Sequence, residues 1–247
     1  MGSSADGHII AIIDHPQRPE FDRKRDENRH PDEVLGFYDV RPGMTILDVF
    51  SGGGYYTELF SIAVGKSGKV IAHNNQAYTH YVKKTLAKRY TDDRLQNVTP
   101  VIQEANQLDV AANSVDMAFL ILAYHDIYYN PKKGNWPKID HDEFLARIYK
   151  ALKPGGILGI IDHNALPGSP NTTGHSLHRI DVDLVIKQVR NSGFVLKERA
   201  YFLENDSDDL AKHMYAPEIR GKTSRFVLKF IKPLKLEQQY VEERTIP

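Results

Sequence analysis

The sequence contains no cysteine, so it forms no disulfide and offers no thiol nucleophile. This absence fits a reducing compartment, and we expect a cytoplasmic protein. No apolar run approaches the roughly 20 residues that are needed to cross a bilayer, so no membrane partner is expected. The first residues also lack the basic segment and long apolar stretch that are typical of a secretion signal.

An excess of either charge is absent as well, since the 247 residues include 32 basic and 32 acidic ones. A nucleic-acid partner usually requires a basic surface, so we expect a small-molecule substrate and not nucleic acid. With 41% hydrophobic residues, a chain of this length can bury the core of one α/β domain. The composition carries no information about the oligomeric state.

From residue 41 onward, apolar runs that fit strands alternate with runs of helical spacing. A helix at 142–152 is expected to end at the Lys-Pro-Gly-Gly stretch 153–156. The pattern predicts one doubly wound α/β domain over residues 41–233, between a capping extension at 1–40 and a tail at 234–247. Its strands are expected at 45–49, 69–73, 98–102, 115–123, 157–161, 194–203 and 225–231.

A glycine turn follows the first of these strands. The apolar run 45–49 contains Asp48 and leads to Gly52, Gly53 and Gly54, after which a helix begins. Glycine permits positive φ and close approach of a ligand, and a helix start offers free N–H groups. We therefore expect a nucleotide-like cofactor here. Nicotinamide, flavin and S-adenosylmethionine proteins share such turns, but the G-x-G-x-x-G spacing that holds a pyrophosphate is missing.

Four segments in order resemble the class I S-adenosylmethionine-dependent methyltransferases: LDVFSGGGYYT, VIQEANQLDVAANSVDMAF, YKALKPGGILGIID and the closing pair of strands. The resemblance covers residues 42–233. It implies a Rossmann-like seven-stranded sheet with a reversed C-terminal strand, S-adenosylmethionine as cofactor, and methyl transfer. RDENRHPDEVLGF and the YHD at 124–126 further resemble a group of bacterial predicted methyltransferases of unassigned substrate.

The resemblance also implies roles for individual residues. Asp48 would orient the turn or meet the amino-acid end of the cofactor, and the backbone of residues 51–54 would pass beneath its methionine part. Glu104 would accept a hydrogen bond from the adenine amino group. The expected cofactor-binding residues are Asp48, Phe50, Ser51, Gly52, Gly53, Gly54, Asn74, Glu104, Ala105, Asn106 and Tyr124.

Two positions depart from the family pattern. Phe50 stands where the family usually has glycine, and Asn74 replaces the acid that holds the ribose hydroxyls. An amide still accepts one hydrogen bond but loses the assistance of a charge. Both changes would weaken cofactor binding, so a non-catalytic S-adenosylmethionine-binding or interaction protein with a degenerate site is the alternative.

Polar side chains follow the fourth and fifth strands, where the methyl acceptor should lie. His125 is the first choice for a general base because its ordinary pKa is near neutrality, and Asp126 would orient it or bind substrate. Helix capping or hydrogen bonding to a buried carbonyl is an equally good interpretation of His125. The expected substrate-binding residues are Tyr55, Tyr56, Arg25, Arg29, His163, His175 and His178. The alternative is a solvated capping segment for the arginines, core or lid packing for the tyrosines and loop packing for the histidines.

We therefore expect methyl transfer to a small molecule, with O- or N-transfer favoured. A metal interpretation also exists, because His175 and His178 form an H-x-x-H pair near His and Asp residues at the strand ends. Such a pair on a loop is a weak signal and the spacing does not define the other ligands, so no metal ligand is assigned.

Overall fold

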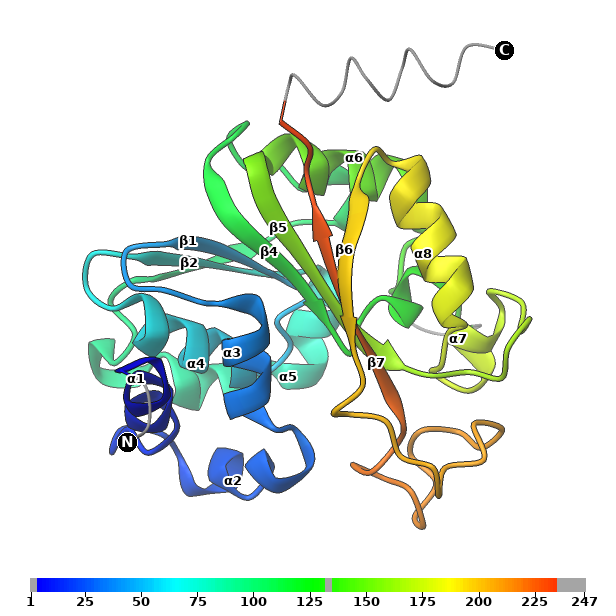
Figure 1. Cartoon of the computed structure of the whole chain (residues 1–247), viewed down its shortest axis with the longest axis horizontal. Helices are drawn as coiled ribbons and strands as arrows, with labels where there is room; N and C mark the ends of the chain where they lie inside the picture. The colour runs from blue at the N-terminus through cyan, green and yellow to red at the C-terminus, as the bar shows by residue number, and fades with distance from the viewer. Residues whose placement is uncertain (1–3, 132–134, 235–247) are drawn as a thin grey trace.

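The computed structural model of the chain describes residues 4–131 and 135–234, so nearly all of the predicted tail at 234–247 lies outside the described residues. Its centre is a seven-stranded sheet with the order β3-β2-β1-β4-β5-β7-β6 (Figure 1). The strands are β1 (Thr45–Val49), β2 (Lys69–Asn74), β3 (Val98–Ile102), β4 (Val115–Ile121), β5 (Leu152–His163), β6 (Val195–Ala200) and β7 (Arg225–Ile231).

The pairing of the strands gives the sheet its direction. The strands β1 to β5 are parallel to one another, whereas β7 runs antiparallel to both β5 and β6. The chain thus has the predicted doubly wound α/β sheet with one reversed strand. Because parallel strands end on the same side, the loops after β1 to β5 all meet at one edge of the sheet, which we call the carboxyl edge.

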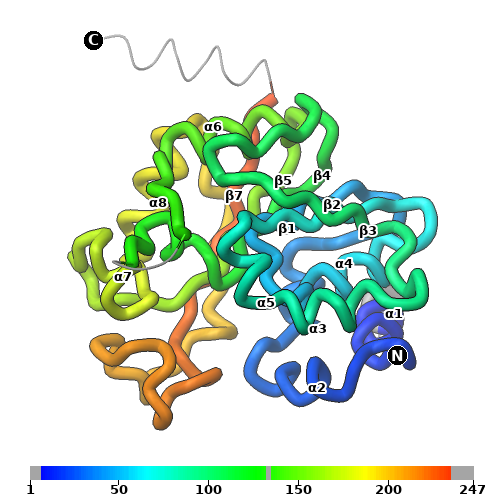
Figure 2. The backbone as a smooth tube through the Cα atoms, turned by 180° about the vertical axis from the view of Figure 1, so that it is seen from behind, coloured from blue at the N-terminus to red at the C-terminus, as the bar shows by residue number. Residues whose placement is uncertain are grey.

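Helices cover both faces of the sheet (Figures 1 and 2). One core joins α1, α3 and α4 to the sheet, and the other joins α6 and α8 to the opposite face. Side chains of β1 alternate between the two, since Ile46 belongs to the first core and Leu47 and Val49 to the second. The helices are α1 (Ser4–Ile13), α2 (Glu20–Arg23), α3 (Pro31–Tyr38), α4 (Tyr55–Val64), α5 (Gln76–Arg89), α6 (His141–Ala151), α7 (Thr173–Ser176) and α8 (Val182–Asn191).

Four strands differ from their predicted bounds, and β2 does so only by extending one residue to Asn74. β4 ends two residues early because Leu122 takes a φ of +58° and turns the chain, while its N–H bonds Ile161. β5 begins at Leu152, so the predicted turn at 153–156 is an irregular part of the strand with Gly155 at φ +79°. β6 covers only Val195–Ala200 of the predicted 194–203.

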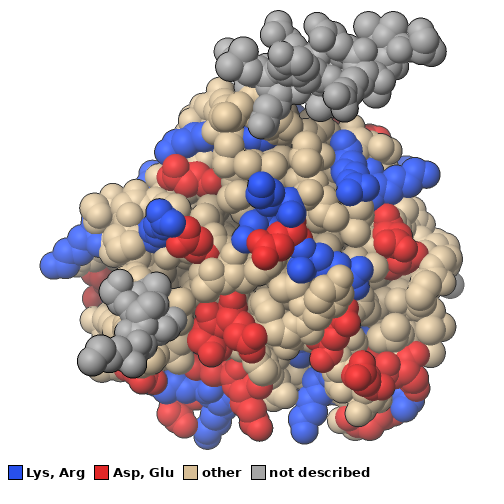
Figure 3. All heavy atoms as spheres, in the orientation of Figure 1, with Lys and Arg blue, Asp and Glu red and all other residues tan. Residues whose placement is uncertain are grey.

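Two segments extend past the carboxyl edge. The N-terminal segment around α2 and the connection 201–224 both reach beyond this end of the sheet in Figure 1. Among the described residues no helix combines the length and apolar character needed to cross a bilayer. On the face shown in Figure 3, basic and acidic side chains are intermixed, and no single-sign stripe is visible there.

Candidate active site

The glycine turn between β1 and α4 has an unusual backbone. Phe50, Gly52 and Gly54 all have positive φ, at +52°, +55° and +81°. A Cβ on Gly53 would lie 2.8 Å from Thr85 and one on Gly54 would lie 3.2 Å from Arg89, whereas one on Gly52 would meet nothing within 4 Å. Packing against α5 therefore explains the second and third glycines, and only Gly52 faces open space.

Asp48 lies inside the fold, beneath the turn. Its carboxylate accepts a 2.6 Å hydrogen bond from the Thr57 hydroxyl in the first turns of α4, and the residue is 3% exposed. Burial raises the pKa of Asp48 to about 7, an effect that the bond from Thr57 opposes. Asp48 thus ties β1 to the following helix.

The side-chain amide of Asn74 is hydrogen-bonded to the same glycine turn. Its oxygen accepts from the Gly52 N–H at 2.9 Å, and its nitrogen donates to the Ser51 hydroxyl and the Gly52 carbonyl, both at 3.1 Å. An aspartate would have no N–H to donate to these oxygens. The amide therefore stabilises the turn itself, which explains why an asparagine suits the position that the family gives to an acid.

Phe50 is part of the apolar core beneath the turn. The residue is 3% exposed, and its ring centroid lies 5.2 to 5.3 Å from those of His73, Tyr78 and Phe144 and 6.1 Å from that of Trp136. Such aromatic contacts add to the stabilisation that comes from burial. The ring thus fills the core between β1 and α6 in a position where glycine would leave space.

The residues predicted around adenine follow β3. Glu104 is partly buried, and its carboxylate accepts a long hydrogen bond from the Gln76 N–H at the start of α5. Ala105 is buried, and the Asn106 amide pairs with the backbone of Asp140 at the start of α6. Tyr124, in the loop after β4, is fully buried, and its hydroxyl donates to Gln188 in α8.

The N-terminus of α4 lies beside the turn. Gly54 is its N-cap and supplies no side-chain hydrogen bond, so no side chain caps the first turn. Tyr55 and Tyr56 follow, and the guanidinium of Arg29 lies 4.5 and 5.7 Å from their ring centroids. Free N–H groups beside a cation favour an anionic ligand.

Two arginines near this place have no acidic partner among the described side chains. Arg29 makes no ion pair, and Arg225 bonds the carbonyls of Asn28, Gly221 and Thr223. Burial lowers the pKa of Arg29, and it lowers the pKa of Arg225 to about 10. Arg25, by contrast, is paired with Asp22. Arg29 and Arg225 are thus cations near Tyr56 that have no acidic partner among the described side chains, whereas Arg25, which lies over the Tyr55 ring, has one.

His125 begins a short helical turn after β4 and is fully buried. Its Nδ1 lies 2.8 Å from Asp162 Oδ1, and its backbone N–H donates to Asp162 Oδ2 at 2.8 Å. Its Nε2 faces His178 Nδ1 at 3.2 Å and Asp126 Oδ1 at 3.4 Å. Burial alone would lower the pKa of His125, but the carboxylates of Asp126 and Asp162 outweigh it and raise the pKa to about 9.

The other predicted histidines have different surroundings. His178, with a φ of +51°, lies 3.5 Å from Asp126 Oδ1 and contacts the rings of Tyr129, His213 and Tyr215. His175 accepts from the Asn130 N–H and is not part of this group. His163 is bonded to the Thr223 hydroxyl, and burial together with neighbouring cations lowers its pKa well below the usual range.

Three residues of this edge were not predicted as site residues. Asp162 lies at the carboxyl end of β5, beside the predicted His163, so its position in the sequence was a usable signal. Tyr78 donates to Asp126 from the first turn of α5, where its spacing indicated only an apolar helix face. Arg225 opens β7 opposite His163 in the sheet register, a neighbour that only the antiparallel pairing provides.

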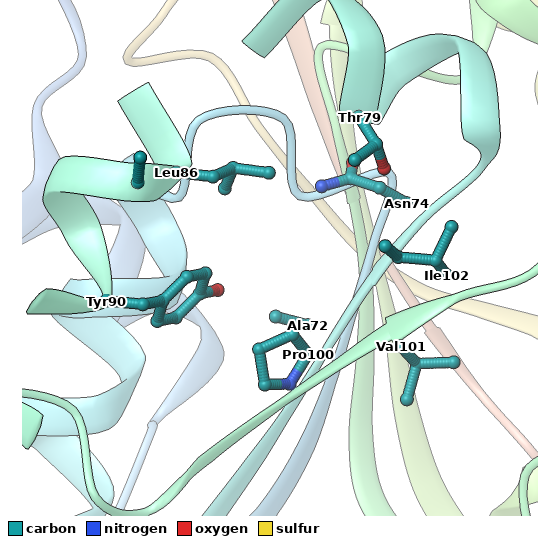
Figure 4. A pocket seen from close by; sticks show the side chains of 9 residues that line it. Ala72, Asn74, Thr79, Leu86, Tyr90, Pro100, Val101 and Ile102 are labelled. Carbon is teal, nitrogen blue, oxygen red and sulfur yellow. The ribbon is translucent and has the colours of Figure 1, made fainter. Parts of the chain in front are cut away.

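A groove opens next to Asn74, between α5 and the strands β2 and β3 (Figure 4). Its volume is about 400 Å³, and its lining is mostly apolar, with Ala72, Leu86, Tyr90 and Ile102 among its walls. In Figure 4 the Tyr90 and Leu86 side chains point across it from the helix. The groove borders the turn from the side of β3.

Comparison with known proteins agrees with this architecture. Residues 47–160 match a family described as a methyltransferase domain. A ubiquinone/menaquinone biosynthesis C-methyltransferase of Hydrogenovibrio crunogenus is 28% identical over 135 residues, which are 54% of this chain and 46% of that protein. The chain thus spans about half the length of the curated relatives that it matches.

Two solved structures share the fold. A methyltransferase from Aquifex aeolicus described as SAM-dependent superposes with a TM-score of 0.60 at 22% identity, over 89% of this chain and 96% of its own. The [4+2]-cyclase SpnF does so with a TM-score of 0.54 at 17% identity, over 86% and 81%. At such identities the likeness concerns the fold, and one fold serves different reactions.

The sheet order and the match of residues 47–160 together support a class I S-adenosylmethionine-dependent methyltransferase domain in this chain. The predicted family, fold class and cofactor are thereby confirmed.

Proposed function

We propose that the protein transfers a methyl group from S-adenosylmethionine to a small-molecule acceptor. The observation that carries this proposal is the shared carboxyl edge, on which the glycine turn and the polar groups after β4 and β5 both lie. Tyr78 joins the two parts, since its ring packs on Phe50 and its hydroxyl donates to Asp126. Methyl donor and acceptor would thus have adjoining places, as an in-line displacement requires.

The residues of the turn side fit the cofactor's two ends. The uncapped first turn of α4 suits the carboxylate of the methionine part, and the open space at Gly52 permits its close approach. Glu104 would accept from the adenine amino group. When bound, S-adenosylmethionine supplies an electrophilic methyl group on a sulfonium.

The acceptor's own chemistry is suggested by the unpaired cations. Arg29 lies over the Tyr56 ring and Arg225 is near it, and neither has a carboxylate partner among the described side chains. Arg225 donates to backbone carbonyls, whereas the Arg29 guanidinium has no such bond there, and a buried cation is stable only with a counter-charge or hydrogen-bond acceptors. We propose that they hold an acidic group of the acceptor, with Tyr55 and Tyr56 as flanking rings. Arginine suits this task because its planar group matches a carboxylate or phosphate.

The atom that is methylated decides what His125 does. A base is needed when the acceptor carries a proton on oxygen or nitrogen, and the position of His125 and Asp126 favours such O- or N-transfer. With a pKa of about 9, His125 is protonated at neutral pH. Its activity as a base would therefore increase as the pH rises toward 9. The curated relatives are named as C-methyltransferases, which makes transfer to carbon the competing possibility.

Phe50 and Asn74 favour a second candidate, a non-catalytic S-adenosylmethionine-binding protein. Phe50 fills space that glycine would leave, and the Asn74 amide is hydrogen-bonded to the turn. Incubation with methyl-labelled S-adenosylmethionine and pools of small acids, phenols and amines separates the two candidates. Labelled product supports transfer, and saturable binding without product supports the alternative.

Two variants test the assignment of residues. We expect Glu104→Ala to weaken cofactor binding, whereas His125→Ala should lower turnover by a factor of about 100 with cofactor binding intact. Circular dichroism and thermal unfolding establish that each variant is folded. Full activity of the His125 variant would refute its role as the base.

A further inference from the structure

Three potential metal ligands converge beyond the ends of β4 and β5. His125 Nε2 lies 3.2 Å from His178 Nδ1 and 3.4 Å from Asp126 Oδ1, and the last two atoms are 3.5 Å apart. His125 and Asp126 come from the turn after β4, and His178 comes from the loop before α8. The three atoms form a nearly equilateral triangle.

We propose that His125, Asp126 and His178 bind one divalent transition-metal ion of the zinc type. Ligands at zinc distances in a tetrahedral site lie about 3.3 to 3.6 Å from one another, and cis ligands of an octahedral ion lie about 3.0 Å apart. The three separations, 3.2, 3.4 and 3.5 Å, agree better with the tetrahedral arrangement. Three protein ligands would leave the fourth position open, as in catalytic zinc sites.

His125 and Asp126 are each oriented by a hydrogen-bond partner on the side that faces away from the proposed ion. Asp162 Oδ1 lies 2.8 Å from His125 Nδ1, so the ring can donate there and direct Nε2 toward the ion. The Tyr78 hydroxyl donates to Asp126 Oδ2 and leaves Oδ1 for the ion. A carboxylate behind a ligating histidine and a donor behind a ligating carboxylate are the usual outer partners of metal ligands.

The ligand types and the burial of the group favour this choice of ion. Two imidazoles and one carboxylate suit zinc and similar transition metals, whereas calcium and magnesium prefer oxygen ligands. The side chains of His125 and Asp126 are 1% and 10% exposed, and that of His178 is 15% exposed. His178 is bordered by the rings of Tyr129, His213 and Tyr215, so the ion would be reached from their side.

A second group of ligand atoms in the described part of the chain serves as a contrast. Asp140, His141 and Asp142 are consecutive, and the last two side chains are 33% and 73% exposed. Asp140 already accepts two N–H bonds as the cap of α6, and no outer partner orients His141. We assign no ion there, and His141 provides a matched control.

An ion at the first group would bind the acceptor's oxygen or nitrogen at its open position and lower that atom's pKa. It would thus perform the task given above to His125 as a base. Metal binding itself does not depend on methyl transfer or on S-adenosylmethionine. Its failure and the failure of the proposed function are therefore measured separately.

The test is calorimetric titration of untagged, chelator-treated protein with Zn²⁺ alone, together with elemental analysis after gel filtration. We expect one Zn²⁺ per chain. His178→Asn keeps a residue that tolerates positive φ and should weaken Zn²⁺ binding by more than about 100-fold, beyond the loss that outer partners cause. Tyr78→Phe removes only the bond to Asp126 and should weaken binding by about tenfold.

Two controls make the result specific. His175→Ala, three residues from His178, and His141→Ala, in the second group, should leave the Zn²⁺ affinity unchanged. The absence of stoichiometric Zn²⁺ would overturn the proposal. Affinity that is unaffected by His178→Asn, or lost with His141→Ala, would do so as well. If His178→Asn does not fold, Asp126→Asn carries the same expectation with an isosteric side chain.

Discussion

The two halves of the carboxyl edge satisfy their polar groups in different ways. On the turn side (residues 50–54, Asn74 and Arg89), the amide of Asn74 and the guanidinium of Arg89 are bonded to the turn and its neighbours. On the histidine side (residues 125–126, 162–163 and 178, with Arg29 and Arg225), histidines face one another and two arginines lack acidic partners. Arg29 has no ion pair among the described side chains, and His125, His178 and Asp126 present ligand atoms to one another, so a bound ligand would add partners on this side.

From this difference we infer that the turn side mainly stabilises the fold and that the histidine side mainly binds a ligand. Changes on the turn side should cost stability, because each group there holds neighbouring elements together. Changes on the histidine side should alter binding more than stability. Substitutions at Arg89, Phe50, Asp48 and Arg29 test this separation.

The largest loss is expected for Arg89→Met. Arg89 is buried between Asp22 and Glu58, and its Nε donates to the Gly53 carbonyl, so it ties the N-terminal segment to the turn. Removing the cation leaves two buried carboxylates without their main partner and should cost about 3 to 5 kcal/mol in the free energy of unfolding. Urea denaturation measures this loss.

An exposed pair provides the control for that experiment. Arg41 and Asp39 have side chains that are 66% and 62% exposed, and Arg41→Ala should cost less than about 1 kcal/mol. Equal losses in the two variants would show that burial of the Arg89 ion pairs does not increase their contribution to stability.

Phe50→Ala should cost about 3 kcal/mol, because the ring loses four aromatic neighbours and leaves a cavity. Phe50→Gly removes the same contacts but relieves the positive φ, so it should be no less stable than the alanine variant. Thermal and urea unfolding of both variants provide the comparison. A loss below 1 kcal/mol would mean that the ring is not a core element.

The pH dependence of stability should report on Asp48. Its folded-state pKa of about 7 lies above the usual 3.8, so the folded chain holds the proton more tightly than the unfolded chain. The contribution of Asp48 to stability therefore falls as the pH rises between those values, by about 2 kcal/mol from pH 5 to pH 7. The difference in unfolding free energy between the parent and Asp48→Asn, measured at both pH values, isolates this contribution. A difference that does not change with pH would contradict the shift.

The smallest stability change is expected on the histidine side. Arg29→Met keeps the aliphatic stem over Tyr55 and Tyr56 and should change the free energy of unfolding by less than about 1 kcal/mol. Transfer of labelled methyl groups to acidic acceptors should nevertheless fall, while cofactor binding stays. A large loss of stability without any loss of transfer would reverse the contrast between the two sides.

Local sequence was enough to predict most of the sheet and the turn side. The strands at 45–49, 98–102 and 225–231 occur with the predicted bounds, because short apolar runs between turn residues are a local signal. α1 was not predicted, since it depends on packing against α3 and α4 that its own sequence does not reveal. β5 extends through a Pro-Gly-Gly stretch because its neighbours β4 and β7 pair with it.

The histidine side was predictable only in part. Strand ends indicated His125 and Asp126, but His178 joins them from a loop more than 50 residues later, and Asp162 lies on another strand. The sequence also suggested His175 and His178 as a pair, whereas in the fold only His178 joins His125 and Asp126, and His175 accepts from the Asn130 N–H. Spacing along the chain cannot specify contacts that depend on the crossing of several loops.

The most direct test is whether the glycine turn binds S-adenosylmethionine. We predict that S-adenosylmethionine and its demethylated product each raise the melting temperature, by an amount equivalent to about 3 kcal/mol at a hundredfold excess over the dissociation constant. NADH should have no effect, and Glu104→Ala should reduce both shifts. No shift with either sulfur compound, or a shift with NADH alone, would contradict the account.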